Sequence, residues 1–178
     1  DRINQVIYIE AQDKIVTTHG WDYCHDFKVK VWDGSTGNIV REITQFKHPV
    51  QLMTWMSKPQ SLVFVDHGRN LWRLSLSDFR LSTPIYLPET MTTYHRLPER
   101  DDEIKLNFGN IQSLTTIPGT NYLLMGIGSY FRGGPGVLLM ELTTSSIKNI
   151  VRMKLGSDGN AQLLVREELF SEALPPQF

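Results

Sequence analysis

Histidine and aspartate lie close together at several places in this sequence, and such residues can serve as general acids and bases. The places are His19 with Asp22, His25 with Asp26, Asp66 with His67, and His95 farther along. Nucleophilic catalysis also needs an activated side chain and a site for the oxyanion. The Gly-x-Ser-x-Gly pattern of a nucleophile elbow is absent from the sequence. Asp26 and Asp66 are better explained as acceptors for backbone N–H groups in turns, so no catalytic residue is predicted.

Cys24 directly precedes His25, a juxtaposition that could supply a thiol and an imidazole. Neighbouring residues on a strand point to opposite faces, although a loop relaxes this rule. Cys24 is the only cysteine, so no disulfide can form within the chain, and a reducing compartment fits best. We expect an intracellular protein, cytoplasmic or nuclear, in which Cys24 is not a nucleophile.

His19, Asp22 and His25 are also close enough in sequence to suggest a metal site on one loop. A catalytic zinc needs three ligands held rigidly, with supporting hydrogen bonds behind them. Surface histidines on a hairpin are the simpler explanation. No metal and no other cofactor is therefore predicted.

A cluster of glycines resembles a phosphate-binding loop. Its members are Gly126, Gly128, Gly133, Gly134 and Gly136. A phosphate-binding loop needs a helix after it, whose N-terminus meets the phosphate. An apolar strand is predicted next, at residues 137–142, so hairpin glycines are the better account.

The composition is that of an ordinary globular chain. Its 178 residues are enough to bury a sizeable core, and the net charge of −1 favours neither nucleic acid nor an anionic membrane as a partner. No apolar run approaches the roughly 18 residues of a membrane span, and no signal peptide is visible at the start. Because the chain begins at Asp1 rather than Met, we expect a fragment or a processed or trimmed product.

Short strands position several of these groups within the first part of the chain. Alternating β-branched and aromatic residues, bounded by Gly, Asp and Asn, indicate strands. They predict strands at residues 6–9, 14–18, 27–32 and 38–43. Residues 33–37 form a tight turn between the last two, because glycine supplies a positive φ without strain.

Several motif residues cluster around Trp32 in this segment. Trp32-Asp33 is followed by Thr36-Gly37, and Asp26 lies six residues before Trp32. With these residues the segment resembles a WD40 repeat, in which the signature Trp-Asp, a Thr-Gly after it and a turn aspartate recur in the same places. The resemblance implies that residues 4–43 form one four-stranded blade of a β-propeller.

Two further units can be aligned with the first, but their signature residues are missing. Residues 48–87 would form a second blade, with strands at 50–56, 61–66, 71–76 and 84–87. Residues 111–153 would form a third, with strands at 111–117, 122–127, 137–142 and 147–153. Ser75-Leu76 and Met140-Glu141 stand where the signature Trp-Asp would be. The family's hydrogen-bond network of His, Ser or Thr, Asp and Trp therefore cannot be complete in the second blade, where Lys47 also replaces the Gly expected before His48.

The rest of the chain departs from the repeat. Residues 88–110 are interpreted as a polar, partly mobile insertion whose charge run at 99–103 is solvated. Residues 154–178 are interpreted as the start of a further blade or a tail, with a strand from 161 up to 165 favoured over a short helix through 167–174. The predicted fold is all-β, a WD40-like propeller segment of about three to four four-stranded antiparallel blades in an incomplete ring. The remaining blades would come from a longer parent chain, a partner or another copy.

The connections of such blades predict an interaction surface. In a four-stranded meander, the link between the second and third strands and the link to the next blade emerge on the same side. Aromatic residues and arginine are enriched at interface hot spots, and several lie on this side. The residues predicted to contact a protein partner are Trp21, Tyr23, His25, Arg69, Tyr130, Phe131 and Arg132. The same side holds Phe46, Lys47, His67, Met91, Tyr94, His95 and Arg96, and roughly half of its rings are expected to fold back onto the blades.

The function predicted from the resemblance is a non-catalytic scaffold within a multiprotein complex, with other protein subunits or peptide motifs as partners. Fold alone does not fix function, so two alternatives stay open. One is a propeller enzyme, a hydrolase or lyase, with histidine and aspartate in the central funnel. The other is a recognition propeller for histone or other peptides, in which an aromatic cage could hold methyl-lysine.

Overall fold

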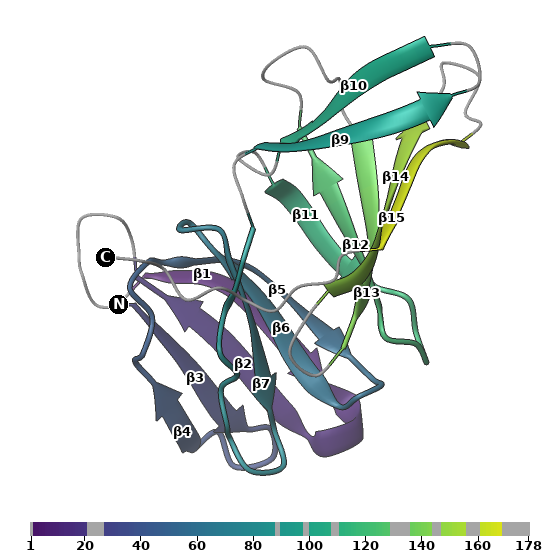
Figure 1. The fold of residues 1–178 in the computed structure, drawn as a ribbon. Coiled ribbons are helices and arrows are strands. Elements are labelled where there is room, and N and C mark those ends of the chain that lie inside the picture. Colours follow the sequence, from purple (N-terminus) through teal and green to yellow (C-terminus); the bar gives the residue numbers. More distant parts are fainter. Residues whose placement is uncertain are drawn as a thin grey trace. The chain divides into compact units, whose positions relative to one another are not determined.

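The computed structural model divides the chain into two compact units, Asp1–Pro84 and Ile85–Phe178 (Figure 1). It describes residues 2–20, 27–87, 90–97, 100–107, 111–128, 136–143, 147–155 and 161–168. These residues form antiparallel strands, and their one helical element is a single 3-10 turn, Glu10–Gln12. The expectation of an all-β fold is confirmed.

The first sheet is an antiparallel meander in the strand order β1-β2-β3-β4. Its strands are β1 (Ile3–Ile9), β2 (Lys14–His19), β3 (Lys28–Asp33) and β4 (Ile39–Ile43). Three of the four predicted strands agree with these bounds to within one residue at each end. The strand predicted at 6–9 begins earlier, at Ile3.

The second sheet repeats this arrangement in the order β5-β6-β7-β8. Its strands are β5 (Val50–Met56), β6 (Ser61–Asp66), β7 (Asn70–Ser75) and the two-residue β8 (Ile85–Tyr86). β5 and β6 have the predicted bounds. Leu74 pairs with Leu62 as Trp32 pairs with Ile15, so Leu74 rather than Ser75 occupies the place of the signature Trp.

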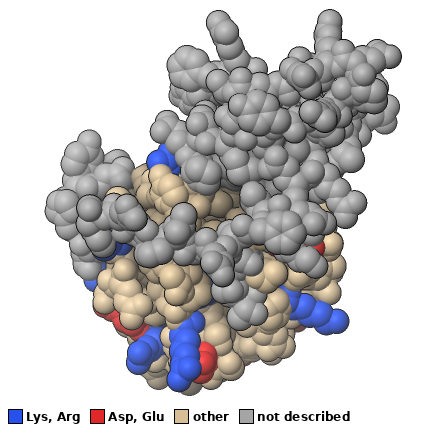
Figure 2. Space-filling model, in the orientation of Figure 1, with Lys and Arg blue, Asp and Glu red and all other residues tan. Residues whose placement is uncertain are grey.

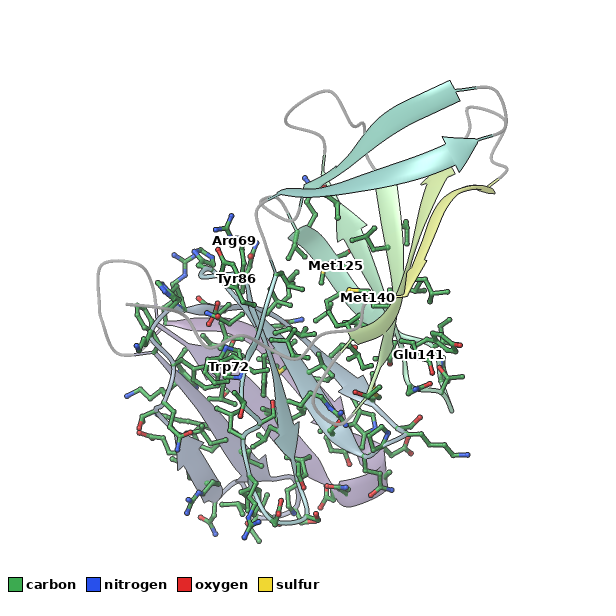
Figure 3. The ribbon with its side chains drawn as sticks, viewed as in Figure 1. Arg69, Trp72, Tyr86, Met125, Met140 and Glu141 are labelled. Atoms are coloured by element: carbon green, nitrogen blue, oxygen red, sulfur yellow. The ribbon has the colours of Figure 1, made fainter. Side chains whose placement is uncertain are left out.

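The second unit contains a five-stranded antiparallel sheet in the order β11-β12-β13-β14-β15. Its strands are β11 (Ile111–Thr116), β12 (Tyr122–Ile127), β13 (Gly136–Leu142), β14 (Ile147–Leu155) and β15 (Ala161–Glu168). Leu123 and Met125 of β12 pair with Met140 and Leu138 of β13, and all four are buried. Figure 3 labels Met125 and Met140 on these two strands. Of the two alternatives for the stretch after residue 160 a strand is observed, and it extends this sheet by pairing with β14.

The stretch interpreted as an insertion contains regular structure that the sequence did not indicate. β9 (Thr90–Leu97) and β10 (Arg100–Asn107) pair in an antiparallel hairpin, a separate two-stranded sheet. Residues 100–103 of the charge run, which we expected to be an irregular surface, are thus part of β10. These residues lack the alternation of apolar and polar types by which a strand is recognised in a sequence.

The same irregularity recurs in the first strand of all three larger sheets. The pairing register shifts between Ile3 and Gln5, between Val50 and Leu52, and between Ile111 and Ser113. The residues that fall outside the pairing are Asn4, Gln51 and Gln112. Each carries an amide side chain, and a bulge of this kind turns a side chain away from the regular alternation. The three sheets therefore repeat each other at a place where no repeat motif had been recognised.

Apolar side chains of the first two sheets meet in one buried cluster. Its members are Ile9, Val16, Phe27, Val29, Val31, Ile43, Phe46, Val50, Met53, Leu62, Phe64, Leu74 and Leu76. Phe46, from the connection between the sheets, packs edge-on against Phe64 and Trp72, with ring centroids 6.0 and 5.5 Å away. This ring was expected on the interaction side, and it is one of those that fold back, because burial removes its apolar area from water.

The first two sheets differ in how completely their two faces are buried. Every residue of β6 is buried, although successive side chains point to opposite faces. In β1 only Ile9 is buried, and Val6 and Tyr8 are 57% and 56% exposed. The second sheet is therefore covered on both faces along β6. In the first sheet, β2 is buried from Val16 to His19, whereas one face of β1 and Ile39 of β4 are exposed.

Replacing Phe64 by Ala tests whether the cluster between the first two sheets holds the first unit together. Phe64 is fully buried, so we expect a loss of about 3–5 kcal/mol in the free energy of unfolding, from lost transfer energy and the cavity left behind. Urea denaturation followed by circular dichroism measures it. Tyr86→Ala, at a residue 58% exposed, is the control and should stay within about 0.5 kcal/mol of the parent. Equal losses in the two variants would contradict this assignment of the core.

Candidate functional site

Arg69 is the one predicted contact residue that the structure describes. It lies in the turn between β6 and β7 (Figure 3), with a backbone φ of 62° and its N–H donated to the Asp66 carbonyl oxygen at 2.9 Å. The remaining predicted contact residues lie outside the described part of the chain: Trp21, Tyr23, His25, Tyr130, Phe131 and Arg132. Of the other residues expected on this side, Lys47 is exposed. The structure does not describe the side chains of β9, which carries several more of them.

A cleft of about 210 Å³ opens on the same side of the first unit. It is lined by Arg2, Asn4, Gly20, Pro49, Val50, Gln51 and His67. Backbone hydrogen bonds hold its walls, since the Gly20 N–H donates to the Arg2 carbonyl at 3.3 Å and the His67 N–H to the Pro49 carbonyl at 3.0 Å. The cleft thus joins the start of β1, the end of β2, the start of β5 and the turn after β6.

Two of the bulge amides lie in this cleft. Asn4 and Gln51 occupy equivalent places in the first two sheets, and both line it. The Asn4 side-chain amide donates to the Gly20 carbonyl oxygen at 2.6 Å, which fixes one wall. Amides both donate and accept hydrogen bonds, as a peptide main chain does. The lining combines them with the basic residues Arg2 and His67 and with apolar Pro49 and Val50.

A buried carboxylate organises the turn that carries His67 and Arg69. Asp66 is 1% exposed and ends β6. Its oxygens accept from the Asn70 backbone N–H at 2.9 Å, from the Asn70 side-chain amide at 3.0 Å and from the Trp72 indole N–H at 2.9 Å. The interpretation of Asp66 as a turn acceptor is confirmed.

His19 holds the corresponding place at the end of β2, and it is buried rather than on the surface. It is 3% exposed, and its Nε2 lies 2.7 Å from the Thr17 hydroxyl oxygen, which accepts from the Trp32 indole N–H at 2.8 Å. The expectation of a surface histidine at this position is wrong, because β2 runs one residue further and carries His19 into the sheet. Burial, and then the charges of Lys30 and Lys28, lower the pKa of His19.

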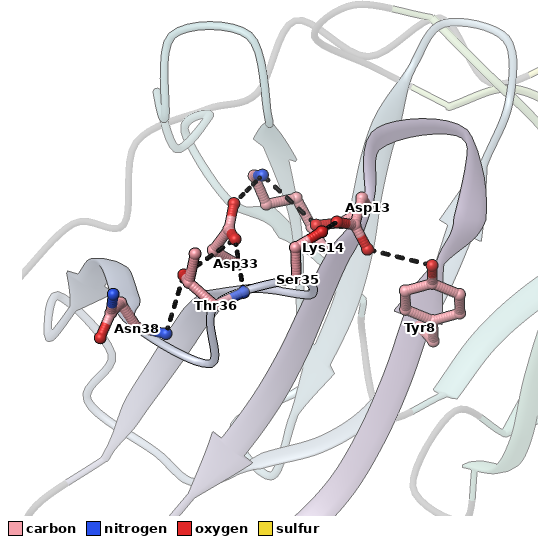
Figure 4. Close-up of polar contacts among 7 residues, drawn as sticks. All are labelled: Tyr8, Asp13, Lys14, Asp33, Ser35, Thr36 and Asn38. Atoms are coloured by element: carbon pink, nitrogen blue, oxygen red, sulfur yellow. Dashed lines mark hydrogen bonds and ion pairs between the residues drawn. The ribbon is translucent and has the colours of Figure 1, made fainter.

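The opposite side of the first sheet is held by short polar contacts (Figure 4). The Asp33 carboxylate accepts from the Lys14 amine at 3.0 Å and from the Thr36 N–H and hydroxyl at 2.9 Å, and these contacts lower the pKa of Asp33 to about 2. Asp13 accepts from the Tyr8 hydroxyl at 3.1 Å and from the Ser35 hydroxyl. These groups are engaged in fixing turns, so this side offers a well-ordered surface rather than a reactive one.

Comparison with solved structures places these sheets in a known architecture. The chain is similar to the crystal structure of RRP9 WD40 repeats, with 13% identity and a TM-score of 0.56 over 90% of this chain and 50% of that one. It is also similar to the β-propeller domain of Myceliophteria thermophila Cps50 (Swd1), with 9% identity and a TM-score of 0.54 over 95% and 56%. A third match, the structure of U3-55K, has 10% identity and a TM-score of 0.52 over 90% and 51%. The chain has the fold of a partial WD40-type β-propeller.

The propeller segment spans about half the length of each of these structures, and its ring is not closed. No family model matches the sequence, and no curated protein matches it either. The three larger sheets correspond to blades. The first two have the four strands that were expected, and the third has a fifth, β15, in place of a further blade. At identities this low the likeness shows the fold alone and says nothing of the functional site.

The part of the propeller that the structure describes contains no group of three His, Cys, Asp or Glu residues placed to hold a metal ion. No helix in that part is long and apolar enough to cross a membrane. The candidate site is therefore the cleft together with the turn that bears Arg69. The cleft was missed in the sequence because it depends on the bulge amides, whose recurrence is visible only once the three blades are aligned by register.

Removing the buried carboxylate of the second blade should destabilise the site. In Asp66→Ala the backbone and side-chain donors of Asn70 and the indole of Trp72 lose their acceptor inside the protein. Leaving buried donors unpaired costs roughly 1–3 kcal/mol, which urea denaturation can measure. Asp78→Ala, in an exposed turn, should change stability by less than about 0.5 kcal/mol. A near-neutral Asp66→Ala variant would show that the network contributes little.

Stability should fall with acid in a way that depends on His19. Its pKa is lowered in the folded state, so below the unfolded value of about 6.5 the unfolded chain binds a proton that the folded chain does not. The free energy of unfolding should therefore decrease as the pH drops from about 6.5 towards the folded pKa. Urea denaturation at several pH values between 5 and 7.5 measures this loss. His19→Gln should flatten the dependence in that range, and His48→Gln, at an exposed position, should leave it in place.

Proposed function

We propose that this chain is a non-catalytic scaffold that binds protein subunits or peptide motifs within a multiprotein complex. The observation that carries the proposal is the cleft on the connection side of the first two blades, next to the turn with Arg69. Its main-chain-like amides, basic residues and apolar residues suit an extended peptide better than a small reactive substrate. The reducing interior of the cell, in the cytoplasm or the nucleus, is part of the proposal and is supported by the single cysteine.

The aromatic residues proposed as contacts continue directly from this cleft in the sequence. Gly20 lines the cleft, and Trp21, Tyr23 and His25 follow it along the chain. Tyr130, Phe131 and Arg132 belong to the equivalent connection of the third blade, between β12 and β13. We assign partner contacts to both groups and to Arg69, since aromatic and arginine anchors dominate binding energy at interfaces.

The central strands of the propeller argue against catalysis in its funnel. β1, β5 and β11 are the first strands of the three blades, and none of them contains His, Asp, Glu, Cys or Lys. A hydrolase or lyase that used imidazole and carboxylate groups at the hub would draw them from these strands. Tyr8 and Met53, which stand there instead, are engaged with Asp13 and with the core.

The charge pattern is that of a protein-binding rather than a nucleic-acid-binding surface. Figure 2 shows lysine and arginine beside aspartate and glutamate at one end of the first unit, with both signs mixed on the visible face. Binding to phosphate backbones relies on a continuous basic patch or stripe. The near-neutral net charge of −1 likewise favours a protein partner over nucleic acid.

Pull-down with the immobilised chain tests the proposal, comparing proteins retained from cell extract by quantitative mass spectrometry. The variants are Trp21→Ala with Phe131→Ala, and Arg69→Asn, which removes the guanidinium but suits a left-handed backbone. We expect specifically retained proteins to fall by about tenfold or more, as at interface hot spots. Arg80→Asn is the matched control, because its side chain is 86% exposed in a connection on the opposite side. Unchanged retention by folded variants would count against the proposed surface.

A further inference from the structure

The first blade has a second apolar face that no other described part of the first unit covers. Val6 pairs with Thr17, Tyr8 with Ile15, and Ile15 with Trp32, so these side chains share one face of the sheet. Trp32 pairs in turn with Ile39 of β4, and Ile3 pairs with His19, which extends the face to both ends. We call the apolar residues Ile3, Val6, Tyr8, Ile15, Trp32 and Ile39 the open face.

Exposure on this face is high on its two outer strands, β1 and β4. Ile3, Val6, Tyr8 and Ile39 are 51%, 57%, 56% and 49% exposed. The residues that fall on the other face of the same sheet, such as Val16, Val29 and Val31, are fully buried against the second blade. An antiparallel sheet with one solvated face carries polar residues there, so a face of this composition marks an interaction surface.

Two charged residues of the open face, Lys30 and Glu42, form an ion pair with each other. The Lys30 amine lies 3.8 Å from the Glu42 carboxylate and 5.8 Å from the centroid of the Trp32 ring. Burying a lone charge is costly, whereas a paired one can be covered without a new partner. The polar groups Thr17 and His19, on the same face, are already buried beneath their neighbours.

We propose that the open face is an interface with a second copy of this chain. The chain covers 50%, 56% and 51% of the propeller structures that it matches, so two copies supply about one ring's complement of blades. In a blade of the same strand order β6 is buried along its whole length, whereas its counterpart β2 leaves Ile15 partly exposed and β1 buries only Ile9. The proposal concerns assembly and does not depend on the scaffold role.

The size of the surface favours two reciprocal contacts over one. Four strands about 4.8 Å apart and five or six residues long at about 3.3 Å each span roughly 300–400 Å². A stable interface takes about 800 Å² from each partner. If the open face of each copy packs against a sheet face of the other about a two-fold axis, each copy contributes two such areas and approaches that size.

Sedimentation velocity of the 178-residue chain tests the proposal over protein concentrations from about 1 to 100 µM, a range in which interfaces of ordinary affinity associate. We expect a monomer–dimer equilibrium with no larger species. Val6→Lys on β1 and Ile39→Lys on β4 should each raise the dimer dissociation constant about tenfold or more, because each places a charge in the apolar contact. Tyr86→Lys is the matched control, with similar exposure and the same type of change on β8, and should leave the constant unaltered.

Two variants on different strands keep the test decisive should one of them fail to fold, which far-ultraviolet circular dichroism would reveal. A chain that stays monomeric at every concentration overturns the proposal and means that something other than a second copy covers the open face. So does an open-ended series of larger species, or a dimer that both open-face variants leave intact. The pull-down variants serve as a further check. If they lose extract proteins but still form the dimer, the scaffold role and this interface are independent of each other.

Discussion

A sheet that is apolar on both faces can be stable in water only when both faces are covered, and this requirement underlies the whole chain. Stacked blades satisfy it, because each blade presents one face to the blade before it and the other to the blade after it. The cluster between the first two sheets is one such contact, with Phe46 filling the space between Phe64 and Trp72. The connection that carries Phe46 therefore links the blades and also contributes to the packing that holds them together.

The strands were predictable because their pattern is local. Alternating Val, Ile and aromatic residues between Gly, Asp and Asn mark strands without any knowledge of their neighbours, and β5, β6 and β12 have the predicted bounds. The hairpin β9-β10 was missed, since its second strand begins Arg-Asp-Asp-Glu and alternates apolar and polar residues only from Ile104 on. β10 obtains its backbone hydrogen bonds by pairing with β9, and this pairing cannot be read from the residues of β10 alone.

Only the side on which the candidate site lies could be predicted from the sequence, and its contact residues stay a prediction. The side of the molecule follows from strand order alone, and the turn with Arg69 is on that side as expected. The cleft could not be foreseen, because it depends on bulges at Asn4 and Gln51 that a regular alternation would not contain. His19 illustrates the same limit, since its burial follows from β2 reaching one residue beyond the Val-Thr-Thr pattern that defined the predicted strand.

The ends of the second strands show how the blades use their polar residues. Ile3 pairs with His19 and Val50 pairs with Asp66, so His19 and Asp66 occupy the same place in successive blades. One is a buried imidazole bonded to Thr17, and the other a buried carboxylate with Asn70 and Trp72 as donors. In an enzyme a histidine and a carboxylate would be brought together in one pocket and left open to a substrate. Here the repeat places them in different blades and engages each with its own tryptophan-bearing strand, so His19 and Asp66 hold their blades in shape.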